Sequence, residues 1–119
     1  MKISELAKSF YAVKTSFCEQ EKDLLLTEKL VNDLLKDPQT PDLELEISGL
    51  KKNIKIQQEL LGSKKTELDI VSRELLGQMH SEGFKPEQKT EVHLTESSYV
   101  EIWPTKKETL ACSTPIKRN

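Results

Sequence analysis

The sequence has few of the residues that fill the core of a large globular domain. Only 35% of its residues are hydrophobic and 5% are aromatic, whereas 32% are charged and the mean hydropathy is -0.56. Such a composition suits helices that bury one apolar stripe and leave their other faces in water. The scarcity of apolar residues therefore predicts elongated helices rather than one compact core.

Long apolar runs, an excess of one charge and closely spaced cysteines are also missing. No run of apolar residues approaches the roughly 20 that a membrane span requires. The net charge of -2 excludes nucleic-acid binding by charge alone. Cys18 and Cys112 are far apart and have no zinc-type spacing. We expect an intracellular chain, cytoplasmic or nuclear, with free thiols and without a membrane span, metal or cofactor.

The sequence contains no motif that would support catalysis. It has no glycine-rich phosphate loop, no GxSxG and no HExxH, and its only histidines are His80 and His93. Both fall where we expect no rigid surroundings, at a helix end and in the C-terminal region. We therefore predict that the chain is not an enzyme.

Apolar residues recur with a heptad period along two long segments. The spacing predicts one helix over 1–36 and a second over 42–82. The predicted seam in the first helix consists of Ile3, Leu6, Phe10, Val13, Phe17, Leu24, Val31 and Leu34. The predicted seam in the second helix consists of Ile47, Leu50, Ile54, Leu61, Leu68, Val71 and Leu75. Gln20, Gln57 and Lys64 occupy seam positions between these residues and weaken the middle.

The segment 37–41 separates the two helices. Pro38 and Pro41 lack amide donors, while Thr40 is suited to cap a helix that begins at Pro41. Folding back over so short a connection is easier than one rod passing through both prolines. We therefore predict an all-α fold, an antiparallel helical hairpin or coiled coil, followed by a mostly disordered C-terminal tail.

Several large apolar residues lie outside this seam, among them Leu25, Leu26, Ile56 and Leu60. Scattered surface leucines are ordinary in folded proteins. The alternative is a second face that buries against another hairpin or a different subunit, as in a four-helix assembly.

The region 83–119 is rich in Pro, Thr, Ser, Glu and Lys, which is typical of disorder. A short aromatic motif near 97–104 interrupts it, with Tyr99, Ile102 and Trp103 as candidate partner-binding residues. This motif either folds back on the hairpin or binds a partner as a linear peptide. Thr114, followed by Pro115, is a candidate phosphosite of proline-directed kinases.

These features favour a non-enzymatic coiled-coil subunit or adaptor of a larger helical complex. In general form the hairpin resembles the small helical subunits of kinetochore, spindle, centrosomal and meiotic assemblies, which implies a role in cell division. The alternatives are a subunit of a trafficking or tethering complex, or a self-contained homodimeric coiled coil. We expect other coiled-coil proteins as partners, in a hetero-oligomer rather than a homodimer, and no direct contact with nucleic acid.

Overall fold

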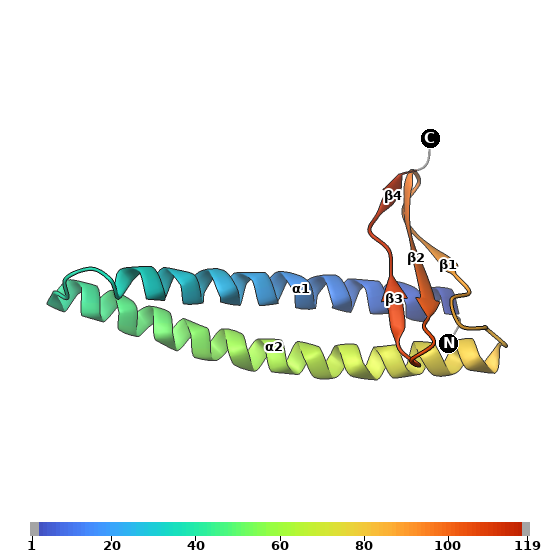
Figure 1. Ribbon diagram of the computed structural model, residues 1–119, viewed down its shortest axis with the longest axis horizontal. Coiled ribbons are helices and arrows are strands. Elements are labelled where there is room, and N and C mark those ends of the chain that lie inside the picture. Colours follow the sequence, from blue (N-terminus) through green and yellow to red (C-terminus); the bar gives the residue numbers. More distant parts are fainter. Residues whose placement is uncertain (1–2, 118–119) are drawn as a thin grey trace. The chain divides into compact units, whose positions relative to one another are not determined.

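The computed structural model describes residues 3–117, which form two long helices followed by four β-strands (Figure 1). The elements are α1 (Ile3–Leu34), α2 (Pro41–Ser81), β1 (Thr90–Thr95), β2 (Ser98–Pro104), β3 (Leu110–Cys112) and β4 (Ile116–Lys117). The chain divides into two compact units. The hairpin unit is Thr15–Thr66, and the head unit comprises the chain up to Lys14 and from Glu67 onward.

Capping hydrogen bonds and a proline determine where α2 begins at the turn of the hairpin unit. Thr40 caps α2, because its Oγ1 accepts a hydrogen bond from the Leu43 amide at 3.2 Å and its carbonyl accepts one from the Glu44 amide at 2.9 Å. Pro41 follows at the first helical position, where no amide donor is needed. The predicted segments 1–36 and 42–82 compare with the observed helices Ile3–Leu34 and Pro41–Ser81.

The core of the hairpin unit is thin. Leu24, Val31 and Ile47 are buried between its two antiparallel helices. The remaining predicted seam residues in this unit are half-buried, namely Phe17, Leu34, Leu50, Ile54 and Leu61. The seam therefore packs, but it excludes water fully at only a few positions.

The predicted disordered tail is wrong, and so is the all-α fold class. Residues 90–117 form a four-stranded antiparallel sheet, and the structure is 63% helical and 16% strand. The physical reason is that buried and more exposed side chains alternate along these strands. Val92 on β1 and Val100 and Ile102 on β2 place their side chains on one buried face. A sheet that covers two helices needs only these few apolar residues, so its polar composition resembles that of a disordered segment.

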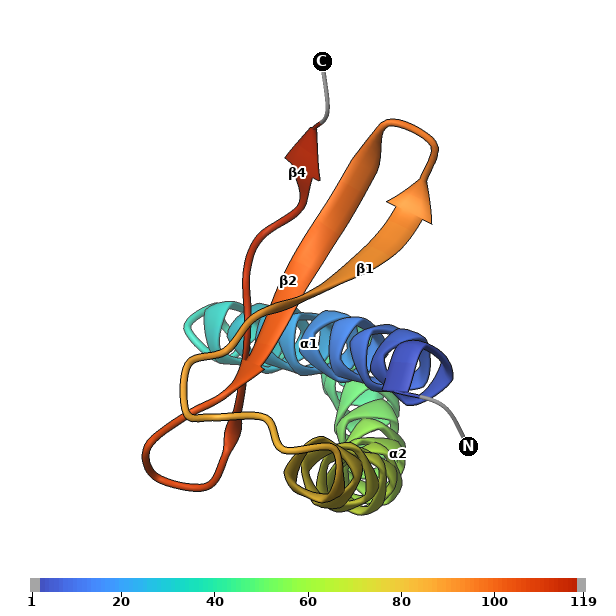
Figure 2. The same cartoon turned by 90° about the vertical axis from the view of Figure 1, so that its right-hand side faces the viewer.

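β2 is the central strand of this sheet. It pairs with β1 on one side, with Val92 opposite Val100, and with β3 and β4 on the other, with Trp103 opposite Ala111 and Tyr99 opposite Ile116. β2 crosses α1 steeply instead of running along it (Figure 2). The other three strands therefore depend on β2 for their pairing.

The head unit has the largest core of the molecule. Its buried members come from the beginning of α1, the end of α2 and the sheet: Leu6, Ala7, Phe10, Leu75, Met79, Val92, Val100 and Ile102. Ile3, Leu68 and Val71 of the predicted seam pack against this cluster and are half-buried, as is Val13 in the same stretch of α1. The helix ends thus contact the sheet as well as each other.

Candidate partner-binding surfaces

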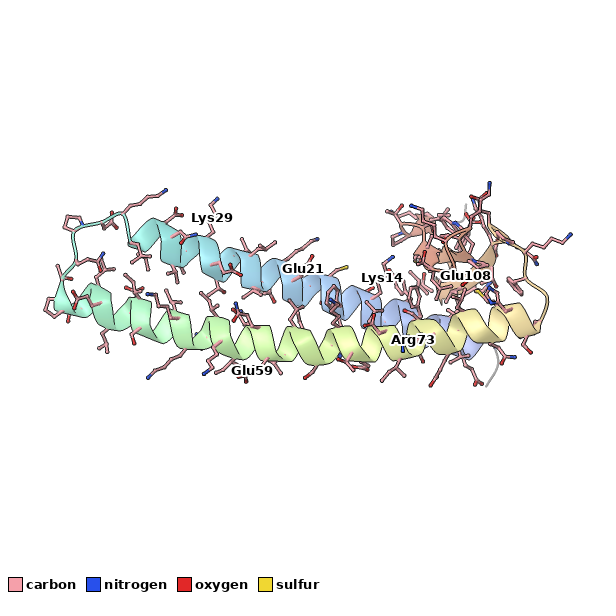
Figure 3. The ribbon with its side chains drawn as sticks, turned by 60° about the horizontal axis from the view of Figure 1, so that its bottom comes forward. Lys14, Glu21, Lys29, Glu59, Arg73 and Glu108 are labelled. Atoms are coloured by element: carbon pink, nitrogen blue, oxygen red, sulfur yellow. The ribbon has the colours of Figure 1, made fainter. Side chains whose placement is uncertain are left out.

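A groove of about 410 Å³ opens on the head unit. Apolar side chains from three elements line it, together with cationic, anionic and small polar groups. Its lining residues are Phe10, Lys14, Leu68, Asp69, Ser72, Arg73, Leu76, Glu108, Thr109 and Leu110. Figure 3 labels Lys14 of α1, Arg73 of α2 and Glu108 of the β2–β3 loop.

The charges of this groove are balanced and belong to separate elements. Lys14 Nζ lies 5.9 Å from the centre of the Phe10 ring, which is within the range of a cation–π contact. Glu108 has a left-handed backbone, with φ at 58°, in the loop opposite. A groove with two cations and two anions attracts neither a purely acidic nor a purely basic ligand.

The thiol of Cys112 in β3 lies near this charged rim. Burial raises its pKa, and the positive charge of Lys14 only partly opposes that effect. Its Sγ donates a hydrogen bond to the Ser113 carbonyl at 3.3 Å. A thiol that keeps its proton is a poor nucleophile.

The histidines and acidic side chains are spread over the described part of the chain. Over residues 3–117, no three His, Cys, Asp or Glu side chains gather as metal ligands. His80 and His93 are exposed on different elements, and the ring of His93 lies 6.5 Å from that of Tyr99. In the same range, no helix is both long enough and apolar enough to cross a bilayer.

A smaller groove of about 170 Å³ runs along one side of the hairpin unit, lined by Gln20, Asp23, Gln57 and Leu60. The Oε1 atoms of Gln20 and Gln57 are buried, and no hydrogen-bond donor among the described residues reaches either one. Gln20 Nε2 donates only a long hydrogen bond, 3.5 Å, to Ser16 Oγ. This polar layer occupies two of the seam positions that the sequence marked as weak.

The hairpin unit also exposes most of the large apolar residues that lie outside its seam. Their exposed fractions range from 47% to 74%. They are Leu25, Leu26, Leu30 and Leu35 on α1 and Leu45, Ile56 and Leu60 on α2. An exposed set of this size within about fifty residues is the strongest indication of a binding surface in the chain.

The other side of the hairpin unit carries a second groove, of about 490 Å³, near the turn. Leu35, Ile47 and several polar residues line it, and its charged members are Glu44, Lys51, Lys52 and Lys55. The two sides of the hairpin therefore differ in charge.

The structure places the candidate residues of the C-terminal region inside the sheet. Ile102 is fully buried, Tyr99 is half-buried in the same strand, and Lys89 Nζ lies 5.1 Å from the centre of the Trp103 ring. These residues do not form a free linear peptide. Thr114 is exposed between β3 and β4. Whether any of them contacts a partner or a kinase stays a prediction.

Sequence reasoning missed the residues that join the sheet to the helices. Ala7 and Met79 are fully buried but lie outside the predicted seam, and Val92, Val100 and Pro104 are buried in a region expected to be disordered. Ala7 and Met79 flank the seam on the same side, four residues after Ile3 and Leu75. The alternation over 90–104 was the one signal that pointed to this packing.

Comparisons of the chain with protein-family models, with curated proteins and with solved structures give no match.

Proposed function

We propose that this chain is a non-enzymatic coiled-coil subunit or adaptor of a larger helical protein complex, with other helical proteins as its partners. The observation that carries the proposal is the exposure of seven large apolar side chains in the hairpin unit, at 47% to 74%. Each square ångström of apolar surface removed from water contributes about 25 cal/mol. Partner helices that cover these side chains would bind with a substantial hydrophobic driving force.

The weakness of the hairpin unit's own core also supports a partner. Only Leu24, Val31 and Ile47 are buried in it, and two glutamine oxygens in its seam receive no hydrogen bond from any residue within 3–117. An unsatisfied buried polar atom costs about 1–3 kcal/mol. Added helices would supply both apolar contacts and donors, as the third and fourth helices do in a bundle.

Two features support the non-enzymatic part of the proposal. Burial raises the pKa of the Cys112 thiol, and the head groove combines Lys14 and Arg73 with Asp69 and Glu108 without a histidine or a cysteine in its lining. Such a groove is suited to holding a polypeptide rather than to activating a nucleophile.

For the biological process we propose cell division. The support is the sequence Thr114-Pro115-Ile116-Lys117, which matches the consensus of cyclin-dependent kinases and in which Thr114 and Pro115 are exposed just before β4. A phosphate there would add negative charge beside Lys117. A trafficking or tethering complex is the second candidate, because the same exposed apolar surface would serve it equally well.

The test is affinity capture of the tagged full-length chain from dividing cells, together with its mass measured by light scattering on a sizing column. The proposal expects a stoichiometric set of other coiled-coil proteins, and their identity names the process. A clean homodimer without companions would overturn it in favour of a self-contained structural coil.

A further inference from the structure

One side of the hairpin unit combines exposed apolar side chains with acidic ones. In the hairpin unit, the a positions of the heptads are those of Phe17, Leu24 and Val31 in α1 and of Ile47, Ile54 and Leu61 in α2. In an antiparallel pair of helices, the residues just before the a positions of both helices, which are the g positions, lie on the same side of the seam. The groove lined by Asp23 of α1 and Leu60 of α2 shows this arrangement, because Asp23 precedes the a residue Leu24 and Leu60 precedes the a residue Leu61. In Figure 3 the labelled Lys29 of α1 and Glu59 of α2 each point away from the opposite helix, so neither residue belongs to this side of the hairpin.

We call this side the acidic flank and define it by the g and c heptad positions of the hairpin unit. Its large apolar members, all at least 47% exposed, are Leu26, Leu30, Ile56 and Leu60. Its charged members, all exposed, are Glu19, Asp23, Asp33, Asp42 and Glu46. No Lys or Arg occupies any g or c position in this unit.

The other side of the same hairpin has a different charge pattern. Its e and b positions carry Lys51, Lys55 and Lys65 as well as the acids Glu21 and Glu44. The uniform sign of the acidic flank is therefore a property of that side and not of the hairpin as a whole. Among the acids of the flank, Asp33 forms an ion pair with the exposed Lys36, with 3.7 Å between Oδ1 and Nζ.

The floor of the acidic flank offers unused hydrogen-bond acceptors. The buried Oε1 atoms of Gln20 and Gln57 border its groove, and no donor among the residues that the structure describes reaches them. A long donor side chain entering from the flank would satisfy these oxygens. Arg, Lys and Gln carry such donors.

We propose that the acidic flank is the docking surface for a basic amphipathic helix of a partner protein. Apolar residues of that helix would pack on Leu26, Leu30, Ile56 and Leu60 in the groove between α1 and α2, which is the geometry of a third helix in a bundle. Its Lys and Arg residues would lie opposite the acids on both edges. This inference rests on the proposed function and specifies the chemistry of the partner.

A second copy of this chain is a poor occupant of the same surface. A symmetric dimer through the acidic flank would place each row of acids against the same row of its partner. Like charges placed directly opposite one another disfavour that pairing. A basic helix instead reduces the repulsion within the flank, and its binding weakens as salt screens the charges.

The test uses the full-length chain and a synthetic amphipathic helix of about three heptads, with Leu at its a and d positions and Lys at its e and g positions. A matched peptide carries Glu in place of each Lys. Binding is followed by fluorescence anisotropy of the labelled peptide at low and high salt. We expect the Lys peptide to bind and to lose at least tenfold in affinity at high salt, and the Glu peptide not to bind.

The variant Asp23→Lys with Glu46→Lys changes one exposed acid of the flank on each helix. Its matched control, Glu21→Lys with Glu44→Lys, makes the same change of charge at exposed e positions on the same helices. The flank variant should weaken binding of the Lys peptide more than tenfold, and the control less than threefold. Circular dichroism checks that both remain helical, and Asp23→Asn with Glu46→Gln replaces the flank variant if it misfolds.

Equal losses in the two variants, or no binding of the Lys peptide to the unaltered chain, would overturn the docking inference. The affinity capture separates this failure from that of the proposed function. If the flank variant recovers the same companions as the unaltered chain, the flank is not their docking surface although the chain remains a subunit. If the unaltered chain recovers no companions, the proposed function itself fails.

Discussion

Gly83 directs the chain from α2 toward the sheet. Its backbone is left-handed, with φ at 82°, and its amide donates to the His80 carbonyl at 3.1 Å, while the Phe84 amide donates to the Met79 carbonyl at 2.9 Å. These two hydrogen bonds form a Schellman motif, in which glycine is preferred because it has no Cβ. Phe84 then packs against the head core beside Met79.

Replacing Gly83 with Ala should destabilise the protein by about 1 kcal/mol, because the left-handed backbone is strained for residues with a Cβ. Gly77 is the matched control, since it lies within α2 with open space around it. Gly77→Ala should stabilise by about 1 kcal/mol through helix propensity. Urea unfolding of both variants measures the difference, and the same sign for both would contradict this account.

The two cysteines should differ in reactivity. Cys112 is half-buried with a raised pKa, and Cys18 is exposed on α1. At neutral pH we expect an aromatic disulfide reagent to modify Cys18 at least tenfold faster than Cys112, because Cys18 is exposed and the raised pKa of Cys112 leaves less of that thiol as the reactive thiolate. The variants Cys18→Ser and Cys112→Ser assign the two phases, and a single fast phase would refute the difference.

The raised pKa of Cys112 also predicts a pH dependence of stability. The unfolded chain loses this thiol proton at a lower pH than the folded chain does. The contribution of the neutral thiol is therefore complete below the unfolded pKa and is lost as the pH rises through the folded pKa. Urea titrations from neutral to alkaline pH should show the free energy of unfolding falling more in the unaltered chain than in Cys112→Ser.

Among the elements, β2 contributes most to the head unit. Three of its side chains, Val100, Ile102 and Pro104, are almost fully buried, and it pairs with all three other strands. β3 and β4 are short, with three and two residues, and depend on that pairing. Loss of packing under β2 should therefore affect the whole sheet.

Ile102→Ala should destabilise the head unit by about 2–5 kcal/mol, the usual range for removing a buried isoleucine side chain beyond Cβ. Trp103, the only tryptophan, reports on the sheet by fluorescence, while far-ultraviolet circular dichroism reports mainly on the helices. Lys106→Ala in the loop between β2 and β3, where the residue is exposed, is the control and should change the free energy of unfolding by less than about 1 kcal/mol. No effect of Ile102→Ala would mean that the sheet does not pack as described.

At the scale of the whole molecule, the proposed binding of partners rests on the exposed apolar side chains of the hairpin unit. Changing both Leu26 and Leu30 to Glu should leave helicity unchanged, since both side chains are exposed, and should abolish recovery of companions from cells. Leu45→Glu serves as control, because Leu45 is more exposed, at 74%, and lies outside the acidic flank. Unaltered recovery with the double variant would count against binding through these leucines.

The local structure of the helices was largely readable from the sequence. Heptad spacing marked the two long helices, and the run from Pro38 to Pro41 marked their turn, because capping and proline geometry act within a few residues. The glycine at position 83, which ends α2, acts through the same kind of local chemistry. The polar layer at Gln20 and Gln57 was also visible as a gap in the apolar seam.

Only the tertiary structure determined that the C-terminal region forms a sheet. A strand such as β1 is stabilised by a partner strand and by the surface beneath it, so Val92 and Val100 signal a sheet only once they face Ala7 and Met79 across the head core. The groove that joins Lys14 to Glu108 likewise brings together residues far apart in the chain. The heptad period of a helix can be read from neighbouring residues in the sequence, whereas strand pairing and the surfaces that it creates depend on contacts between residues far apart in the chain.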